Sequence, residues 1–158
     1  MKRILSVLAL VVPLVATAAP ASAADDDKAK IGVAREMIAA WKAADWRKVA
    51  DLFAEDGVLH SMMIDPVVGR PAIYERIAAL GKGAPDGVVL DVAHMGLIDG
   101  LVFIERTDRF VYNGHAGSTP VVGVLDIRDG KVKVWREYYD RASLLREMGV
   151  SGDPGASK

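Results

Sequence analysis

One segment, residues 102–112, constrains the fold of this chain more than any other. It is rich in β-branched and aromatic residues, with Asp99-Gly100 before it and Asn113-Gly114 after it. These are strand and tight-turn signals, so we predict one long strand between two hairpin turns. Side chains alternate between the two faces of a strand. The even-numbered face carries Val102, Ile104, Arg106, Asp108, Phe110 and Tyr112.

An arginine and an aspartate therefore share a face that is otherwise apolar. Burying Arg106 and Asp108 costs free energy unless the two charges are paired and hydrogen-bonded. Such a cost is often accepted at functional sites, which makes the pair a candidate. A structural ion pair in the core, or a solvent face with incidental apolar neighbours, is the alternative at this point.

The N-terminal residues have the pattern of a targeting segment. Lys2 and Arg3 precede an apolar run over 4–15, and Ala21-Ser22-Ala23 is a small-x-small cleavage signal. We predict a signal peptide over 1–23, cut after Ala23, and a secreted or periplasmic protein. The alternative is an uncleaved membrane anchor, for which the run is short and Pro13 interrupts it.

Composition narrows the partners. The chain has no cysteine, so an exported protein would fold without disulfides. Without Lys2 and Arg3, 18 of the 20 basic residues stand against 21 acidic ones. This balance gives no basic surface for nucleic acid, and after signal cleavage we expect no membrane contact.

The length of the chain predicts one domain, over 28–148, and the Gly, Pro and Ser residues of 149–158 predict a disordered tail. The expected helices cover 28–44, 46–54 with Asp45 as cap, a segment opened by Gly69-Arg70-Pro71, and a short one capped by Asp140. The expected strands cover 58–64, 88–98, 102–112, 119–127 and 131–139. This order predicts an α+β fold, with a curved, mostly antiparallel sheet that forms a cone around helices on its concave face.

The last strand offers a second carboxylate, Glu137, but its alternation does not decide which face points inward. The odd positions hold Trp135 and Glu137, and the even positions hold Arg136 and Tyr138. If the odd face is inward, Glu137 enters the same cavity as Arg106 and Asp108. Two carboxylates around one arginine can share a proton, so that one acts as acid and the other as base.

Histidine spacing gives little support to a metal site, and we assign none and no cofactor. His94 shares the even face of its predicted strand with Leu90 and Val92, so we expect it in the core or the pocket lining. His60 lies on the first predicted strand and is placed near the cavity.

Several segments together resemble limonene-1,2-epoxide hydrolases. They are Phe53-Ala54-Glu55-Asp56 through Arg70, Ile104-Glu105-Arg106-Thr107-Asp108, Val122-Gly123-Val124 and Trp135-Arg136-Glu137-Tyr138-Tyr139-Asp140. The resemblance implies the cone of the nuclear-transport-factor-2-like superfamily, commonly a homodimer. It also implies that Arg106 bridges, Asp108 protonates the epoxide oxygen and Glu137 activates water.

This chain departs from the family on the water side. The family has a Tyr and an Asn where this chain has Leu59 and Ser61, and an Asp where it has Glu137. Ser61 keeps one hydrogen-bonding group, whereas Leu59 keeps none. The expected lining for substrate and water is Leu59, His60, Ser61, His94, Ile104, Phe110 and Trp135.

The first hypothesis is an epoxide hydrolase-like enzyme that adds water to a small apolar epoxide, with Arg106, Asp108 and Glu137 as catalytic residues. The second is a non-catalytic, exported protein that binds a small apolar ligand. The third is an isomerase or dehydratase of the same fold that uses His60 or Glu137 as base. The superfamily fold alone does not choose among them.

Overall fold

Six strands form one sheet in the computed structural model of the chain, which describes residues 23–151. The strands are β1 (Phe53–Ser61), β2 (Val67–Val68), β3 (Val88–Ile98), β4 (Leu101–Tyr112), β5 (His115–Arg128) and β6 (Lys131–Tyr138). The helices are α1 (Ala23–Lys42), α2 (Trp46–Asp51), α3 (Arg70–Gly83) and α4 (Arg141–Glu147).

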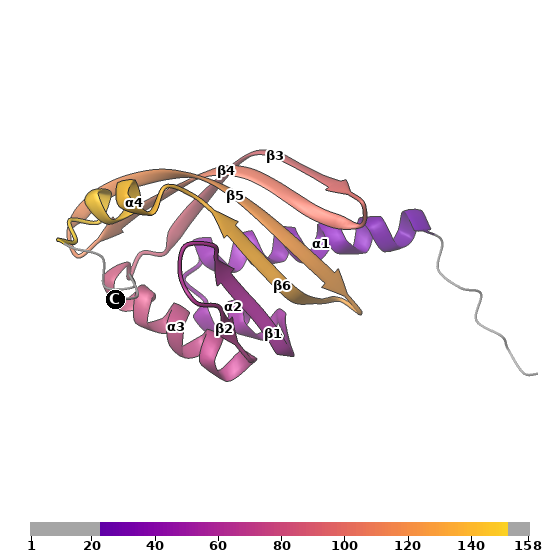
Figure 1. The fold of residues 1–158 in the computed structure, drawn as a ribbon. Coiled ribbons are helices and arrows are strands. Elements are labelled where there is room, and N and C mark those ends of the chain that lie inside the picture. The colour runs from indigo at the N-terminus through magenta and orange to yellow at the C-terminus, as the bar shows by residue number, and fades with distance from the viewer. Residues whose placement is uncertain (1–22, 152–158) are drawn as a thin grey trace, which may run out of the picture.

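The sheet has the strand order β2-β1-β6-β5-β4-β3, and only the β1–β6 pair is parallel. Its long strands bend around α1, α2 and α3, which lie on the concave side, while α4 lies at one end of the sheet (Figure 1). The predicted α+β class, with a curved and mostly antiparallel sheet, is confirmed.

Three hairpin turns set the register of β3 to β6. The pairs Asp99-Gly100, Asn113-Gly114 and Asp129-Gly130 all have positive φ at both residues, as tight hairpin turns with the favoured twist require. These turns fix which residues face each other, because turn geometry determines register in a hairpin. Arg106 therefore lies opposite Val121, and Asp108 lies opposite Thr119.

Both predicted helix caps are present. Asp45 accepts a hydrogen bond from the backbone N–H of Lys48 at 2.9 Å, and α2 begins at the next residue. Asp140 accepts from the backbone N–H of Ser143 at 3.1 Å and opens α4. A capping carboxylate satisfies an N–H group that the first helical turn leaves unpaired.

The core lies between the concave face of the sheet and helices α1 to α3. Met37, Phe53, Ile73, Ile77 and Leu125 are all fully buried in it. The rings of Phe53 and Trp135 stack with centroids 6.2 Å apart. This packing fixes the N-terminal half of β1 against β6, and thereby positions the strand that carries Glu137.

The predicted second helix is too long and the predicted first strand starts too late. The helix ends at Asp51, and β1 begins at Phe53 and ends at Ser61. The reason is an irregular pairing: the β1–β6 register shifts between Phe53 and Val58, and the backbone N–H of Val132 donates to Leu52 O at 2.9 Å. Residues 54–57 thus form an irregular part of the strand, although their sequence has the pattern of a helix end.

Parts of the predictions for the N-terminus and the C-terminus concern residues that the structure does not describe. Residues 1–22 of the predicted signal peptide lie outside them, and α1 begins at Ala23. Of the predicted tail, only 149–151 is described. Within 23–151, no helix is both long enough and apolar enough to span a bilayer.

Candidate active site

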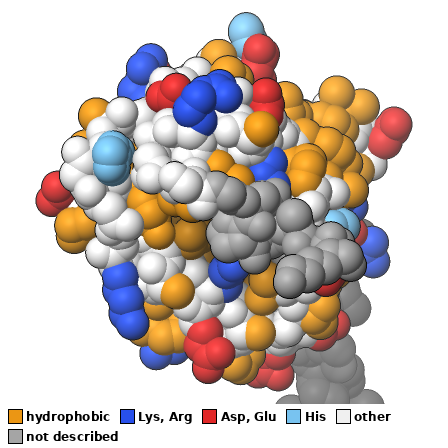
Figure 2. Space-filling model, turned by 60° about the vertical axis from the view of Figure 1, so that its left-hand side comes forward, with side chains coloured by type: hydrophobic (Ala, Val, Ile, Leu, Met, Phe, Trp, Pro, Cys, Tyr) orange, Lys and Arg blue, Asp and Glu red, His pale blue; other side chains and the backbone are white. Residues whose placement is uncertain are grey.

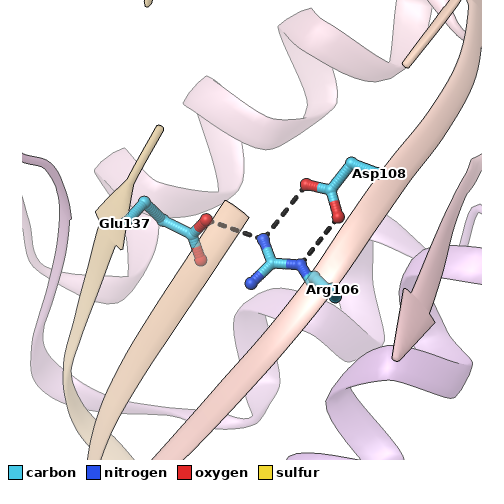
Figure 3. Close-up of polar contacts among 3 residues, drawn as sticks. All are labelled: Arg106, Asp108 and Glu137. Carbon is cyan, nitrogen blue, oxygen red and sulfur yellow. Dashed lines mark hydrogen bonds and ion pairs between the residues drawn. The ribbon is translucent and has the colours of Figure 1, made fainter. Parts of the chain in front are cut away.

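Arg106, Asp108 and Glu137 meet on the concave face of the sheet. Arg106 Nε donates to Asp108 Oδ1 at 2.7 Å, and Arg106 Nη2 donates to Asp108 Oδ2 at 3.1 Å. The same Nη2 donates to Glu137 Oε2 at 2.6 Å. Figure 3 shows the guanidinium between the two carboxylates, with Asp108 from β4 on one side and Glu137 from β6 on the other. The odd-numbered face of the last strand therefore points inward at Glu137.

The trio is almost enclosed by protein. Arg106 is 4% exposed and Glu137 is 8% exposed, whereas 15% of the Asp108 side chain is accessible. Burial raises the pKa of Glu137 to about 7, although the Arg106 guanidinium acts in the opposite direction. Burial also raises the pKa of Asp108 against the effect of Arg106. Near neutral pH, the two coupled carboxyls can therefore hold one proton between them.

A cavity of about 420 Å³ opens beside the trio. Its lining includes residues of α3 and α4, so it lies toward the end of the sheet where α4 is found (Figure 1). Figure 2 brings this end forward, and hydrophobic side chains are seen in its hollow. The apolar lining is Trp41, Trp46, Leu59, Ile77, Leu80, Ala84, Val88, Leu90, Phe110, Val121, Trp135, Leu144, Leu145, Met148 and Val150. This volume and this largely apolar lining are typical of a small-molecule site.

Gly123 of β5 lies directly under the trio. A Cβ at this position would come within 2.6 Å of Arg106 Nη1, 3.0 Å of Trp135 Nε1 and 3.3 Å of Glu137 Oε1. Within the described part of the chain, these three polar atoms are buried without a hydrogen bond of good geometry, although the Trp135 indole N–H is near enough to the Glu137 carboxyl to lower its pKa. The missing side chain therefore lets the guanidinium and the carboxyl approach the sheet and each other.

Four of the predicted lining residues line the cavity. Leu59 and Ser61 come from β1, where Ser61 lies opposite Glu137 and Leu59 lies opposite Trp135. Phe110 and Trp135 line it from β4 and β6. Ile104 was expected there too, but it is buried in the main core and does not line the cavity.

The placement of His94 in the lining is wrong. The β3–β4 register shifts between Val92 and His94, which reverses the alternation of side chains. The His94 side chain is consequently 82% exposed on the outer face, with Nδ1 2.8 Å from Glu105 Oε2.

The placement of His60 near the cavity is also wrong. In β1 it stands between Leu59 and Ser61, which both face inward, and it lies opposite Arg136 of β6. Its side chain therefore points to the convex face, and an isomerase mechanism with His60 as base has no support from this geometry.

Several cavity residues were missed by the sequence reasoning. Thr119 lies opposite Asp108 on β5, is 2% exposed, and has a buried hydroxyl with no partner among the described residues. Arg76 of α3 and Arg141 of α4 also line the cavity. The register of the Asn113-Gly114 hairpin could have found Thr119, whereas the two arginines depend on the packing of helices.

The site gives no indication of a bound metal. Within residues 23–151, no group of three or more His, Cys, Asp or Glu side chains is placed to hold a metal ion. What the site offers is a pair of coupled carboxyls, a guanidinium that orients both, and an apolar space in front of them. The two carboxyls can therefore take a proton from one group of a bound molecule and donate a proton to another.

The fold recurs in solved structures of several kinds of protein. An LEH-like epoxide hydrolase from M. tuberculosis is 19% identical, with a TM-score of 0.69 over 78% of this chain and 91% of that one. A candidate polyketide cyclase from Xanthomonas campestris is also 19% identical, with a TM-score of 0.70 over 78% and 98% of the two chains.

A third structure, from Catenulispora acidiphila, has a ketosteroid isomerase-like fold and was solved in complex with trimethylamine. It is 21% identical, with a TM-score of 0.67 over 75% of this chain and 93% of that one. At these identities, the likeness shows the nuclear-transport-factor-2-like fold and leaves the activity open. The model of the SnoaL-like domain matches residues 34–135, which include β4 and Trp135, and the chain belongs to the SnoaL-like domain family.

Proposed function

We propose that this protein is an epoxide hydrolase-like enzyme that adds water to an apolar epoxide in one step. The observation that carries the proposal is the bridge from Asp108 through Arg106 to Glu137 at the wall of an apolar cavity. Opening an epoxide with water needs a base for the nucleophile and an acid for the departing oxygen. A buried pair of carboxyls that holds one proton supplies both.

In the proposed reaction, Glu137 takes a proton from a water molecule as the water oxygen attacks a ring carbon. The ring C–O bond breaks, and Asp108 donates its proton to the oxygen that leaves the carbon. The product is a vicinal diol, with Asp108 ionised and Glu137 protonated. A proton transfer between the carboxyls, through solvent in the cavity, restores the starting state. No bond to the protein forms, and the reaction needs no cofactor.

The pKa of Glu137 suits a base. A general base works best when its pKa lies near the working pH, because it is then ionised often enough and still basic enough. Burial raises the pKa of Glu137 to about 7, which meets this condition. The reactive form has the proton on Asp108 and Glu137 ionised, which is one of the two ways in which the coupled pair can hold a single proton.

The water side of the site differs from the resembled family. Ser61 lies opposite Glu137 across the parallel β1–β6 pair, so its hydroxyl can orient a water beside that carboxyl. Leu59 adds only apolar surface. The longer Glu137 side chain reaches Arg106 at 2.6 Å, so the extra methylene does not separate the carboxyl from the trio.

The experiment is to offer purified protein a panel of small apolar epoxides and measure diol formation. We expect turnover by the wild type and a loss of at least about 10³-fold in Asp108→Asn and in Glu137→Gln. Glu105→Gln is the matched control, because Glu105 is on the same strand as Asp108 but exposed on the other face. Circular dichroism checks that all variants fold.

One alternative has a specific observation behind it. Leu59 stands where the resembled family has a residue that holds the attacking water, and it makes this part of the cavity apolar. A protein that only binds an apolar ligand would have such a lining. Saturable binding of apolar ligands with no diol from any epoxide in the panel would favour that function.

We also propose export, since residues 1–23 have the pattern of a signal peptide.

A further inference from the structure

Thr119 of β5 has a buried hydroxyl that none of the described residues satisfies with a hydrogen bond. Its side chain is 2% exposed and belongs to the lining of the cavity. A buried hydroxyl without a partner costs free energy, and native proteins keep few such groups. A molecule that enters the cavity can supply the missing partner, which makes Thr119 a candidate for contact with the ligand.

The register of the sheet places this hydroxyl beside the proposed acid. Thr119 lies directly opposite Asp108 in the antiparallel β4–β5 pair, and both residues line the cavity. Directly opposed side chains of such a pair point to the same face of the sheet, with Cβ atoms about 4.5–5.5 Å apart. The hydroxyl and the carboxyl therefore border the same part of the cavity wall.

Among the described residues of β3 and β5, Thr119 is the one hydrogen-bonding side chain next to Asp108 on the inward face. On the other side of Asp108, Leu90 of β3 lies directly opposite. The diagonal neighbours on that face are apolar or have no side chain, and they are Val88, Val92, Gly117 and Val121. Arg106 already donates to both carboxylate oxygens of Asp108. A ligand oxygen above Asp108 therefore finds its second donor at Thr119.

We propose that the Thr119 hydroxyl donates a hydrogen bond to the ring oxygen of the epoxide while Asp108 protonates that oxygen. The inference rests on the proposed function and adds a residue to its acid side. An epoxide oxygen has two lone pairs, so it can accept from the carboxyl and from the hydroxyl together. As the ring C–O bond breaks, the oxygen gains negative charge and the bond from Thr119 strengthens. Thr119 keeps its own proton, because the proton of the new alcohol comes from Asp108.

Stability distinguishes this role from a structural one. Thr119→Val removes the hydroxyl and keeps the branched shape of the side chain, whereas Thr119→Ser keeps the hydroxyl. Because the hydroxyl has no partner within the described protein, Thr119→Val should unfold at the same urea concentration as the wild type or at a higher one. A lower midpoint in Thr119→Val would show that the hydroxyl is bonded within the protein, and would overturn the proposal.

Kinetics test the contact with the reacting oxygen. On an epoxide that the wild type hydrolyses, Thr119→Val should lower kcat about 10–100-fold and change KM less than about threefold, because the bond is stronger in the transition state. Thr119→Ser should recover most of kcat. Thr107→Val is the matched control and should match the wild type, because Thr107 precedes Asp108 on β4, lies opposite Pro120 and does not line the cavity.

The pH profile separates a bond to the substrate from a bond to the acid. If the hydroxyl bonds the substrate, the pH values of half-maximal kcat should be the same in Thr119→Val as in the wild type. An unchanged kcat in Thr119→Val would overturn the proposal. A shifted profile with an unchanged maximum would also overturn it, since Thr119 would then act on the Asp108 carboxyl.

Binding of unreactive compounds separates this inference from the proposed function. Cyclooctanone and methylenecyclooctane have nearly the same shape, and only the ketone has an oxygen that accepts hydrogen bonds. The tryptophans of the chain, Trp41, Trp46 and Trp135, all line the cavity, so intrinsic fluorescence reports its occupation. We expect the wild type to prefer the ketone about tenfold, and Thr119→Val to reduce that preference about fivefold.

The outcomes of turnover and binding are independent. An unchanged preference for the ketone in Thr119→Val overturns the role of Thr119 and leaves the hydrolase. A preference that depends on Thr119, with no diol from any epoxide, overturns the hydrolase and leaves Thr119 as the residue that binds a ligand oxygen.

Discussion

Gly123 lies so close to Arg106 that a Cβ on the glycine would come within 2.6 Å of Nη1. The guanidinium cannot move aside without lengthening its bonds to Asp108 and Glu137. We therefore expect Gly123→Ala to keep the fold, to lower the free energy of unfolding by about 1–3 kcal/mol, and to reduce diol formation strongly.

Gly96→Ala is the matched control for that variant. Gly96 is in β3, is exposed, and has no atom within 4 Å of an added Cβ. Its stability, measured by urea denaturation, and its activity should match the wild type. Equal behaviour of the two alanine variants would mean that the trio does not depend on the approach of Arg106 to β5.

Because the pKa of Glu137 is raised in the folded protein, the free energy of unfolding should depend on pH. Its pKa is about 7 in the folded protein and near its usual value of 4.5 in the unfolded chain, so the folded state binds the proton more tightly. Stability should therefore decrease as pH rises from about 4.5 to about 7 and then level off. The raised pKa of Asp108 acts in the same direction.

Urea denaturation at a series of pH values checks this expectation. The decrease attributable to Glu137 should be on the order of 3 kcal/mol, and Glu137→Gln should remove most of it. A wild-type protein that becomes more stable over the same pH range would show that Glu137 is ionised throughout, as a simple ion pair with Arg106 would be.

Azide can assign the acid and the base. An anionic nucleophile needs no deprotonation, so azide should restore ring opening in a variant that lacks the base and not in one that lacks the acid. We expect azido alcohol from Glu137→Gln and none from Asp108→Asn, as measured by mass spectrometry. Azido alcohol from Asp108→Asn and none from Glu137→Gln would mean that Asp108 is the base and Glu137 the acid of the same site.

The convex face of the sheet motivates a prediction of a homodimer. Val122 and Tyr138 lie opposite each other on β5 and β6, and are 39% and 44% exposed. Large exposed apolar residues at adjacent positions are typical of an interaction surface. We expect light scattering to give the mass of a dimer and Val122→Lys to give that of a monomer. A wild-type monomer at micromolar concentration would contradict this expectation.

The regular parts of the fold could be predicted because their local signals agree. The Asp-Gly and Asn-Gly turns, the caps at Asp45 and Asp140, and the alternation of β4 all depend on neighbouring residues. The same alternation placed Arg106 and Asp108 on one inward face, and the close bond between them follows from that placement.

Two bulges explain most of what could not be predicted. The shift between Val92 and His94 turns His94 outward, and the β5–β6 register shifts between Asp126 and Ile127. Because of the second shift, Val132 and Trp135 both face the core although one position is even and the other odd. The sequence pattern of the last strand was therefore ambiguous about Glu137, and only the pairing of the strands decides it.

The central claim is that water adds directly to the epoxide with Asp108 and Glu137 as acid and base. A single turnover in H₂¹⁸O, with protein in excess over substrate, tests it most directly. The account predicts one ¹⁸O atom in every diol molecule and none in the carboxyl groups of the protein. Unlabelled diol with ¹⁸O in Asp108 or Glu137 would show a covalent ester intermediate and contradict the account.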